Sequence, residues 1–132
     1  MKTILILDDD SAVRESLSDF FEDREWHVLP AGSAEEALEV LDHETPDGAV
    51  VDIRLPGMDG NSFILEAVKK RPNLAYVIAT GSPEYSLPET VAGMCGVSEQ
   101  VFAKPITDLA SLEQVLLRQM EKCSTGGDGH GQ

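Results

Sequence analysis

The sequence predicts a doubly wound α/β domain, in which a five-stranded parallel sheet carries helices on both faces. Short apolar runs alternate with segments of helical periodicity along the whole chain, a pattern typical of right-handed βαβ crossovers. The first run, TILIL at residues 3–7, is apolar without interruption, as expected of a strand that is covered on both faces. The 132 residues are enough for one domain with its own core.

The expected strands and helices follow from these runs and from residues that start or stop helices. The Ser33–Glu36 stretch (SAEE) has the pattern of a capping box, and Ser11 and Asp59 are further candidate caps. Between residues 81 and 100 the pattern is weak and predicts only a short helix near 88–94. Strands are expected at 3–7, 26–29, 49–51, 75–79 and 101–103, and the clearest later helices at 60–70 and 108–122.

The net charge and the lengths of the apolar runs limit the binding partners and the cellular location expected for this protein. A net charge of −14 argues against direct binding to nucleic acid or to an anionic membrane surface. No apolar run approaches the roughly 18 residues of a membrane span, and the chain start lacks a signal-peptide pattern, so a cytoplasmic location is expected. The last stretch, 123–132, contains four glycines. We therefore expect one domain over 1–122, followed by a flexible glycine-rich tail.

Polar side chains follow four of the predicted strands. Asp8 and Asp9 follow the first strand, Asp52 the third, Thr80 the fourth and Lys104 the fifth. In open parallel sheets the ligand site lies at the carboxyl ends of the strands, so these groups are expected to converge. Three carboxylates form a site for a hard cation such as Mg²⁺, and a lysine with a hydroxyl suits a phosphoryl group. Asp52 is the candidate nucleophile, with Asp8 and Asp9 holding the metal.

The stretches ILILDDDSA, AVVDIRLPGMDG, YVIATGS and VFAKPI resemble, in order and spacing, the receiver domain of two-component response regulators over roughly residues 2–122. The resemblance implies the flavodoxin/CheY-like strand order 2-1-3-4-5. It implies that Asp52 is the phosphoacceptor and that Asp9 and Asp52 bind Mg²⁺ directly, with Asp8 acting through water. The main-chain carbonyl of Arg54 is implied as the third protein ligand. Thr80 and Lys104 are implied as the groups that move toward the phosphoryl group and pair with it.

The family also implies partners. Its members take the phosphoryl group from a histidine kinase or a phosphotransfer domain in a phosphorelay, and they hydrolyse the aspartyl phosphate slowly themselves. The expected role is therefore a phosphoacceptor signalling domain rather than a metabolic enzyme. Its output is a downstream protein or an effector domain beyond this chain, with a phosphorylation-dependent dimer as one form of that output.

One position departs from the family pattern. The aromatic residue usually found three positions before the lysine is replaced by Val101, and Phe102 is expected to face the other side of its strand. We therefore predict that a phosphorylation signal runs through the backbone after Thr80, over residues 81–100, rather than through a rotating ring. Arg54 and Ser82 occupy positions that flank the phosphoryl group in the family and tune its hydrolysis.

Two alternatives stay open at this level. A degenerate receiver would fold and bind a protein partner without being phosphorylated; the intact acidic, Thr80 and Lys104 positions argue against it. A dehalogenase-like phosphohydrolase also uses an aspartyl nucleophile, but it usually has a second Asp two positions later. That position holds Arg54 here, and the chain is short for a substrate cap.

Overall fold

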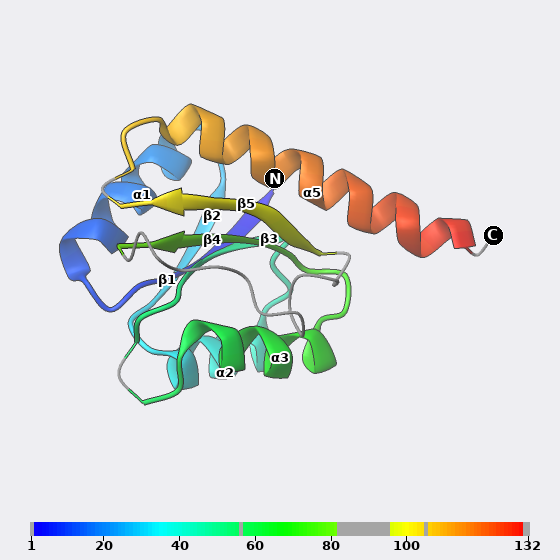
Figure 1. The fold of residues 1–132 in the computed structure, drawn as a ribbon, viewed down its shortest axis with the longest axis horizontal. Helices are drawn as coiled ribbons and strands as arrows, with labels where there is room; N and C mark the ends of the chain where they lie inside the picture. The colour runs from blue at the N-terminus through cyan, green and yellow to red at the C-terminus, as the bar shows by residue number, and fades with distance from the viewer. Residues whose placement is uncertain (1, 56, 82–95, 105, 131–132) are drawn as a thin grey trace.

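The computed structural model describes residues 2–55, 57–81, 96–104 and 106–130. Its centre is a five-stranded, all-parallel sheet with the order β2-β1-β3-β4-β5, which confirms the predicted fold class and strand order. Helices α1 and α5 cover one face and helices α2 and α3 the other (Figure 1). The bounds are β1 Thr3–Leu7, α1 Ser11–Asp23, β2 His27–Ala31, α2 Ala34–His43, β3 Gly48–Asp52, α3 Gly60–Lys70, β4 Ala75–Thr80, β5 Val97–Ala103 and α5 Leu109–His130.

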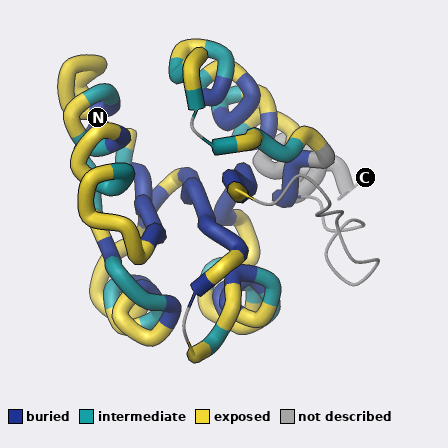
Figure 2. The backbone as a smooth tube through the Cα atoms, turned by 60° about the vertical axis from the view of Figure 1, so that its left-hand side comes forward, coloured by how far each residue is buried: buried dark blue, intermediate teal, exposed yellow. Residues whose placement is uncertain are grey.

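The sheet separates two apolar cores. Successive residues of β1 point to opposite faces, so that Leu5 and Leu7 join the core beneath α2 and α3, whereas Ile4 and Ile6 join the core beneath α1 and α5. All four are fully or almost fully buried. The buried strands run through the centre of the molecule in Figure 2. Coverage on both faces explains why the first strand is apolar at every position.

Two of the three predicted caps are confirmed. The Ser33 hydroxyl accepts a hydrogen bond from the Glu36 N–H at 3.1 Å, and the Asp59 carboxylate accepts one from Ser62 at 2.8 Å. The expectation for Ser11 was wrong, because Asp10 caps α1 and Ser11 is its first residue. Asp10 has an extended backbone, and its carboxylate accepts bonds from two N–H groups of the first turn.

Four strands extend beyond their predicted ranges, β3 and β4 by one residue at an end and β2 and β5 by more. Strand β2 continues through Pro30, which is tolerated because β2 lies at the edge of the sheet. Strand β5 begins at Val97 rather than at residue 101, because Val97 pairs with Tyr76 ahead of an irregularity in the β4–β5 register. This early pairing depends on a neighbouring strand, so it left no local pattern in the sequence.

Helix α5 continues to His130, past the expected helix end at Lys122. Its later turns extend away from the sheet (Figure 1), and an existing helix can lengthen by adding one hydrogen bond per residue. The boundary between a domain at 1–122 and a tail at 123–132 remains a prediction. The helix expected near 88–94 lies outside the described residues. Within the described ranges, no helix is long and apolar enough to cross a membrane.

Candidate functional site

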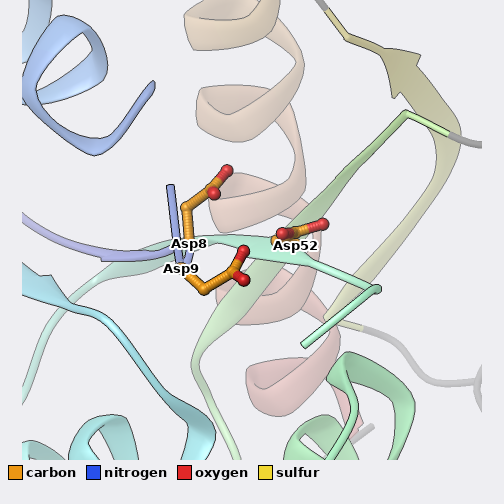
Figure 3. A group of neighbouring side chains, drawn as sticks. All are labelled: Asp8, Asp9 and Asp52. Atoms are coloured by element: carbon orange, nitrogen blue, oxygen red, sulfur yellow. The ribbon is translucent and has the colours of Figure 1, made fainter. Parts of the chain in front are cut away.

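Three carboxylates meet where β1 and β3 end (Figure 3). Asp8 and Asp9 directly follow β1, and Asp52 is the last residue of β3. One carboxylate oxygen from each residue lies within 4.8 Å of the other two. Asp8 and Asp52 are buried, whereas Asp9 is exposed to solvent. The neighbouring positions of β1 and β3 in the parallel sheet bring together carboxylates that are far apart in the sequence.

Lys104 brings a cation to the same cluster from the other side of β4. Its backbone N–H donates to the Thr80 carbonyl at 2.9 Å, which ties the end of β5 to the end of β4. Its ammonium donates to the Asp8 carboxylate at 2.7 Å and lies 3.2 Å from the Asp52 carboxylate. One ammonium therefore bridges two buried carboxylates from different strands.

The electrostatics reflect this excess of carboxylates. Burial, followed by the charge of Asp8, raises the pKa of Asp52 above its ordinary value, and Lys104 only partly offsets this rise. Burial alone would lower the pKa of Lys104, but its hydrogen bond and ionic interaction with Asp8, and then those with Asp52, outweigh it and raise the pKa. The ammonium is thus held charged, while the paired carboxylates still repel each other.

Backbone groups fix the carboxylates in place. The Asp52 carboxylate accepts from the Arg54 N–H at 3.2 Å, and the Asp8 carboxylate accepts from the Asp10 N–H at 2.9 Å. Gly60 packs directly on the chain after β3, where its N–H donates to the Ile53 carbonyl at 3.1 Å. A Cβ at Gly60 would collide with the carbonyl oxygen of Asp52 and lie 2.9 Å from the Ile53 Cα. Helix α3 can therefore begin so close to Asp52 only with glycine at this position.

Of the remaining predicted site residues, Thr80 and Arg54 lie at this edge of the sheet. Thr80 is buried at the end of β4. Arg54 is exposed and makes no ion pair with another described residue. Ser82 lies outside the described residues. Val101 packs with the core beneath α2 and α3, and Phe102 with the core beneath α5, so the predicted opposite orientation of these two side chains is confirmed.

Two residues of this edge were not singled out from the sequence. Gly60 follows a candidate cap, and only the close backbone approach distinguishes it from an ordinary loop glycine. Arg14, at the end of the first turn of α1, donates from Nη1 to the main-chain carbonyl of Asp8 at 2.7 Å. No spacing rule of the sequence indicates that this arginine turns back toward the end of β1. Chemically, the assembled edge offers oxygen ligands for a divalent cation beside a fixed ammonium.

The chain matches the family model described as response regulator receiver domain over residues 4–116. It is 30% identical over 131 residues to response regulator MprA of Mycolicibacterium vanbaalenii, covering 98% of this chain and 54% of that protein. It is 33% identical over 105 residues to protein-glutamate methylesterase/protein-glutamine glutaminase 2 of Paramagnetospirillum magneticum, covering 78% and 30% of the two chains. The chain thus spans at most about half the length of these curated relatives.

Solved structures agree with the fold. A CheY-like receiver domain protein from Methanospirillum hungatei has a TM-score of 0.79 and 30% identity, covering 96% of this chain and 99% of that one. Response regulator TrrA of Thermotoga maritima, solved with Mg²⁺ and BeF, has a TM-score of 0.75 and 24% identity, covering 90% and 99%. The phosphohydrolase alternative is set aside by these matches, and the chain belongs to the receiver domain family of two-component response regulators.

Proposed function

We propose that this chain accepts a phosphoryl group on Asp52 from a histidine kinase or a phosphotransfer domain, with Mg²⁺ as its cofactor. The observation that carries the proposal is the Lys104 ammonium in contact with both the Asp8 and Asp52 carboxylates, beside the third carboxylate of Asp9. Buried carboxylates in excess over cations cost stability unless a ligand compensates them. A divalent cation and a phosphoryl group together complete this arrangement.

The donor set fits Mg²⁺, which takes oxygen ligands and is usually bound by one or two carboxylates together with water and phosphate oxygens. Asp9 and Asp52 are the proposed direct ligands, with Asp8 acting through water and the Arg54 main-chain carbonyl as a third protein ligand. Bound there, Mg²⁺ supplies charge neutralisation of the phosphoryl oxygens. The three clustered carboxylates support this assignment because each has an oxygen within 4.8 Å of the others.

In the proposed step, an Asp52 carboxylate oxygen forms a bond to phosphorus as the bond between phosphorus and the donor's imidazole nitrogen breaks. The electron pair of the broken bond stays on the imidazole, which takes up a proton, and Asp52 becomes an acyl phosphate. The Lys104 ammonium, already 3.2 Å from Asp52, is in place to pair with the phosphoryl oxygens. The Thr80 hydroxyl then donates to the phosphoryl group, which changes the end of β4.

Incubation with acetyl phosphate and Mg²⁺, followed by intact mass measurement, tests the proposal. The wild type is expected to gain one phosphoryl group, and Asp52→Asn to gain none. Asp19→Asn, at an exposed position of α1, is the matched control and should be phosphorylated like the wild type. A folded wild type that gains no mass, or an Asp52→Asn variant that gains it equally, would leave the degenerate receiver as the better description.

The positions of Val101 and Phe102 suggest the route by which phosphorylation of Asp52 changes the rest of the domain. Because Val101 occupies the face where a ring would rotate, the conformational change is expected to travel through the backbone after Thr80. Addition of an acyl-phosphate mimic should shift amide resonances over residues 81–100. Unchanged amide resonances there would contradict this route.

Arg54→Ala should alter the dephosphorylation rate if the guanidinium reaches the phosphoryl group. An unchanged rate would make Arg54 a surface residue without a role in hydrolysis.

The signalling context follows from the family. The proposed partners are a histidine kinase or phosphotransfer protein upstream and a downstream protein or effector domain, in the cytoplasm. The relatives matched here are about twice as long as this chain or longer, which supports an effector domain as one output. The effector and any phosphorylation-dependent dimer can be identified from the full-length gene product and from its size in solution with and without phosphorylation.

A further inference from the structure

Arg14 links α1 to the acidic end of β1. The side chain is half-buried, and its Nη1 donates to the main-chain carbonyl oxygen of Asp8 at 2.7 Å. That carbonyl belongs to the peptide group that joins Asp8 to Asp9. A hydrogen bond from a charged guanidinium is about twice as strong as a neutral one, so it fixes the plane of this peptide firmly.

The peptide group on the other side of Asp9 is also fixed. The Asp10 N–H, which belongs to the peptide joining Asp9 to Asp10, donates to the Asp8 carboxylate at 2.9 Å. Asp9 itself is exposed, and its carboxylate accepts no hydrogen bond from any residue that the structure describes. The direction of the Asp9 Cα–Cβ bond is therefore set by the two peptide groups that flank this residue.

We propose that Arg14 is a positioning residue for the metal site, which orients the peptide before Asp9 so that the Asp9 carboxylate lies beside that of Asp52. This inference rests on the proposed function, because it assumes that the three carboxylates bind Mg²⁺. Arg14 touches neither the cation nor the phosphoryl group in this account. It acts through the Asp8 carbonyl and the backbone of Asp9.

The connection between β2 and α2 confines the guanidinium. Gly32 lies beside it, and a Cβ at Gly32 would be 3.3 Å from Arg14 Nη1. The Gly32 N–H is itself held by the Glu36 carboxylate at 2.7 Å, so the backbone there is not free to withdraw. Glycine thus leaves the space that the arginine occupies, and Gly32→Ala crowds the guanidinium without removing it.

A positioning role and a simple charge effect predict opposite results. A guanidinium near the carboxylates repels a divalent cation, so its removal would tighten Mg²⁺ binding if charge alone mattered. If Arg14 orients Asp9, its removal loosens a ligand and weakens Mg²⁺ binding. Residues that orient metal ligands typically contribute about 10- to 100-fold in metal affinity.

The first test is Mg²⁺ titration by calorimetry at fixed ionic strength. Arg14→Met is expected to bind Mg²⁺ about tenfold more weakly than the wild type. Arg14→Lys should bind more tightly than Arg14→Met, because lysine keeps a cationic donor. Arg118→Met removes the same charge from an exposed position on α5 and should bind like the wild type. Wild-type or tighter binding by folded Arg14→Met would overturn the proposal.

Phosphorylation kinetics provide a second test of the proposal. With acetyl phosphate as donor, Arg14→Met should need about tenfold more Mg²⁺ for half-maximal rate, while its rate at saturating Mg²⁺ stays near the wild-type value. Amide resonances of Asp9 and Asp10 should shift in the metal-free variant. If the variant does not fold, Gly32→Ala serves in its place, with weaker Mg²⁺ binding expected and unchanged binding as the contrary result.

These results distinguish a failure of the proposed function from a failure of the proposed role of Arg14. A folded wild type that binds no Mg²⁺ would defeat the proposed function itself. A wild type that binds Mg²⁺ and is phosphorylated on Asp52, together with an Arg14→Met variant of equal affinity, would defeat only the role of Arg14.

Discussion

Two charged clusters of this molecule differ in how their charges are balanced. Where α1 ends beside α5, the Glu113 carboxylate accepts from the Trp26 indole N–H at 2.9 Å and lies 3.4 Å from the Arg24 guanidinium. At the carboxyl ends of the strands, three carboxylates lie together, and the Lys104 ammonium pairs with two of them, those of Asp8 and Asp52. The first cluster is compensated within the described residues, and the second keeps an excess of negative charge.

The difference indicates what each cluster is for. The compensated carboxylate of Glu113 links α5 to the connection between α1 and β2 without needing anything from solution. An uncompensated, buried group costs folding free energy, and such a cost is typical of a site that binds a ligand or carries out chemistry. The raised pKa of Asp52, caused first by burial and then by the charge of Asp8, reflects that cost. Four experiments test the comparison, in order of decreasing expected effect.

Lys104→Met should have the largest effect. In metal-free protein at pH 7, the free energy of unfolding should fall by about 3 kcal/mol, because two buried carboxylates lose their cation. Urea unfolding with a chelator measures the loss, and added Mg²⁺ should recover part of it. Lys122→Met, at an exposed position of α5, is the control. A Lys104→Met loss no greater than that of Lys122→Met would contradict the electrostatic account.

Gly60→Ala and Gly48→Ala compare the backbone at the two ends of β3. A Cβ at Gly60 meets backbone atoms of Asp52 and Ile53, whereas one at Gly48 meets the Leu116 side chain, with its Cδ1 at 2.8 Å. Backbone cannot rotate away, so Gly60→Ala should cost about 2 kcal/mol and Gly48→Ala about 1 kcal/mol. Thermal unfolding measures both. Gly81→Ala, where nothing lies within 4 Å, is the control; equal losses at Gly60 and Gly48 would remove the distinction.

Asp52→Asn should stabilise the metal-free fold by about 1 kcal/mol at pH 7, because it removes one buried charge. The pKa of Asp52 is raised above its ordinary 3.8 in the folded state. The contribution that the neutral Asp52 carboxyl makes to folding stability is therefore fully present below about pH 3.8, and it is lost as the pH rises through the raised pKa. The gain from Asp52→Asn should accordingly shrink as the pH falls toward 4.

Asp42→Asn is the matched control for that pH trend. A hydrogen bond from Lys70 lowers the pKa of exposed Asp42, so its favourable contribution is present above the ordinary pKa and is lost in acid. Asp42→Asn should therefore show the opposite trend, at lower pH, in urea unfolding measured from pH 7 to pH 2. The same trend in both variants would show that the sign at Asp52 does not come from its burial.

Glu113→Gln should have the smallest effect, within about 0.5 kcal/mol. The amide oxygen can still accept from the Trp26 indole, so only the charge interaction with Arg24, whose side chain is 45% exposed, is lost. Urea unfolding followed by Trp26 fluorescence measures stability, and intact mass after acetyl phosphate treatment should be unchanged. A loss larger than that of Lys104→Met would reverse the ranking of the two clusters.

Local patterns of the sequence determined the fold class, most helix starts and the candidate residues at the strand ends. Continuous apolar runs such as TILIL follow from burial on two faces, and the Ser33 and Asp59 caps depend on groups within a few residues of each other. The convergence of Asp8, Asp9, Asp52 and Lys104 was predicted because parallel strands end at one edge. Their individual roles remain proposals.

Only the tertiary structure decided features that depend on contacts between distant segments. The early start of β5 depends on pairing with β4, and the need for glycine at position 60 depends on how closely α3 approaches Asp52. The contact from Arg14 to the Asp8 carbonyl requires α1 to pack back against the end of β1. A sequence pattern records the environment that each residue needs, but these distances are set by how whole elements pack, and so no short stretch of the chain contains them.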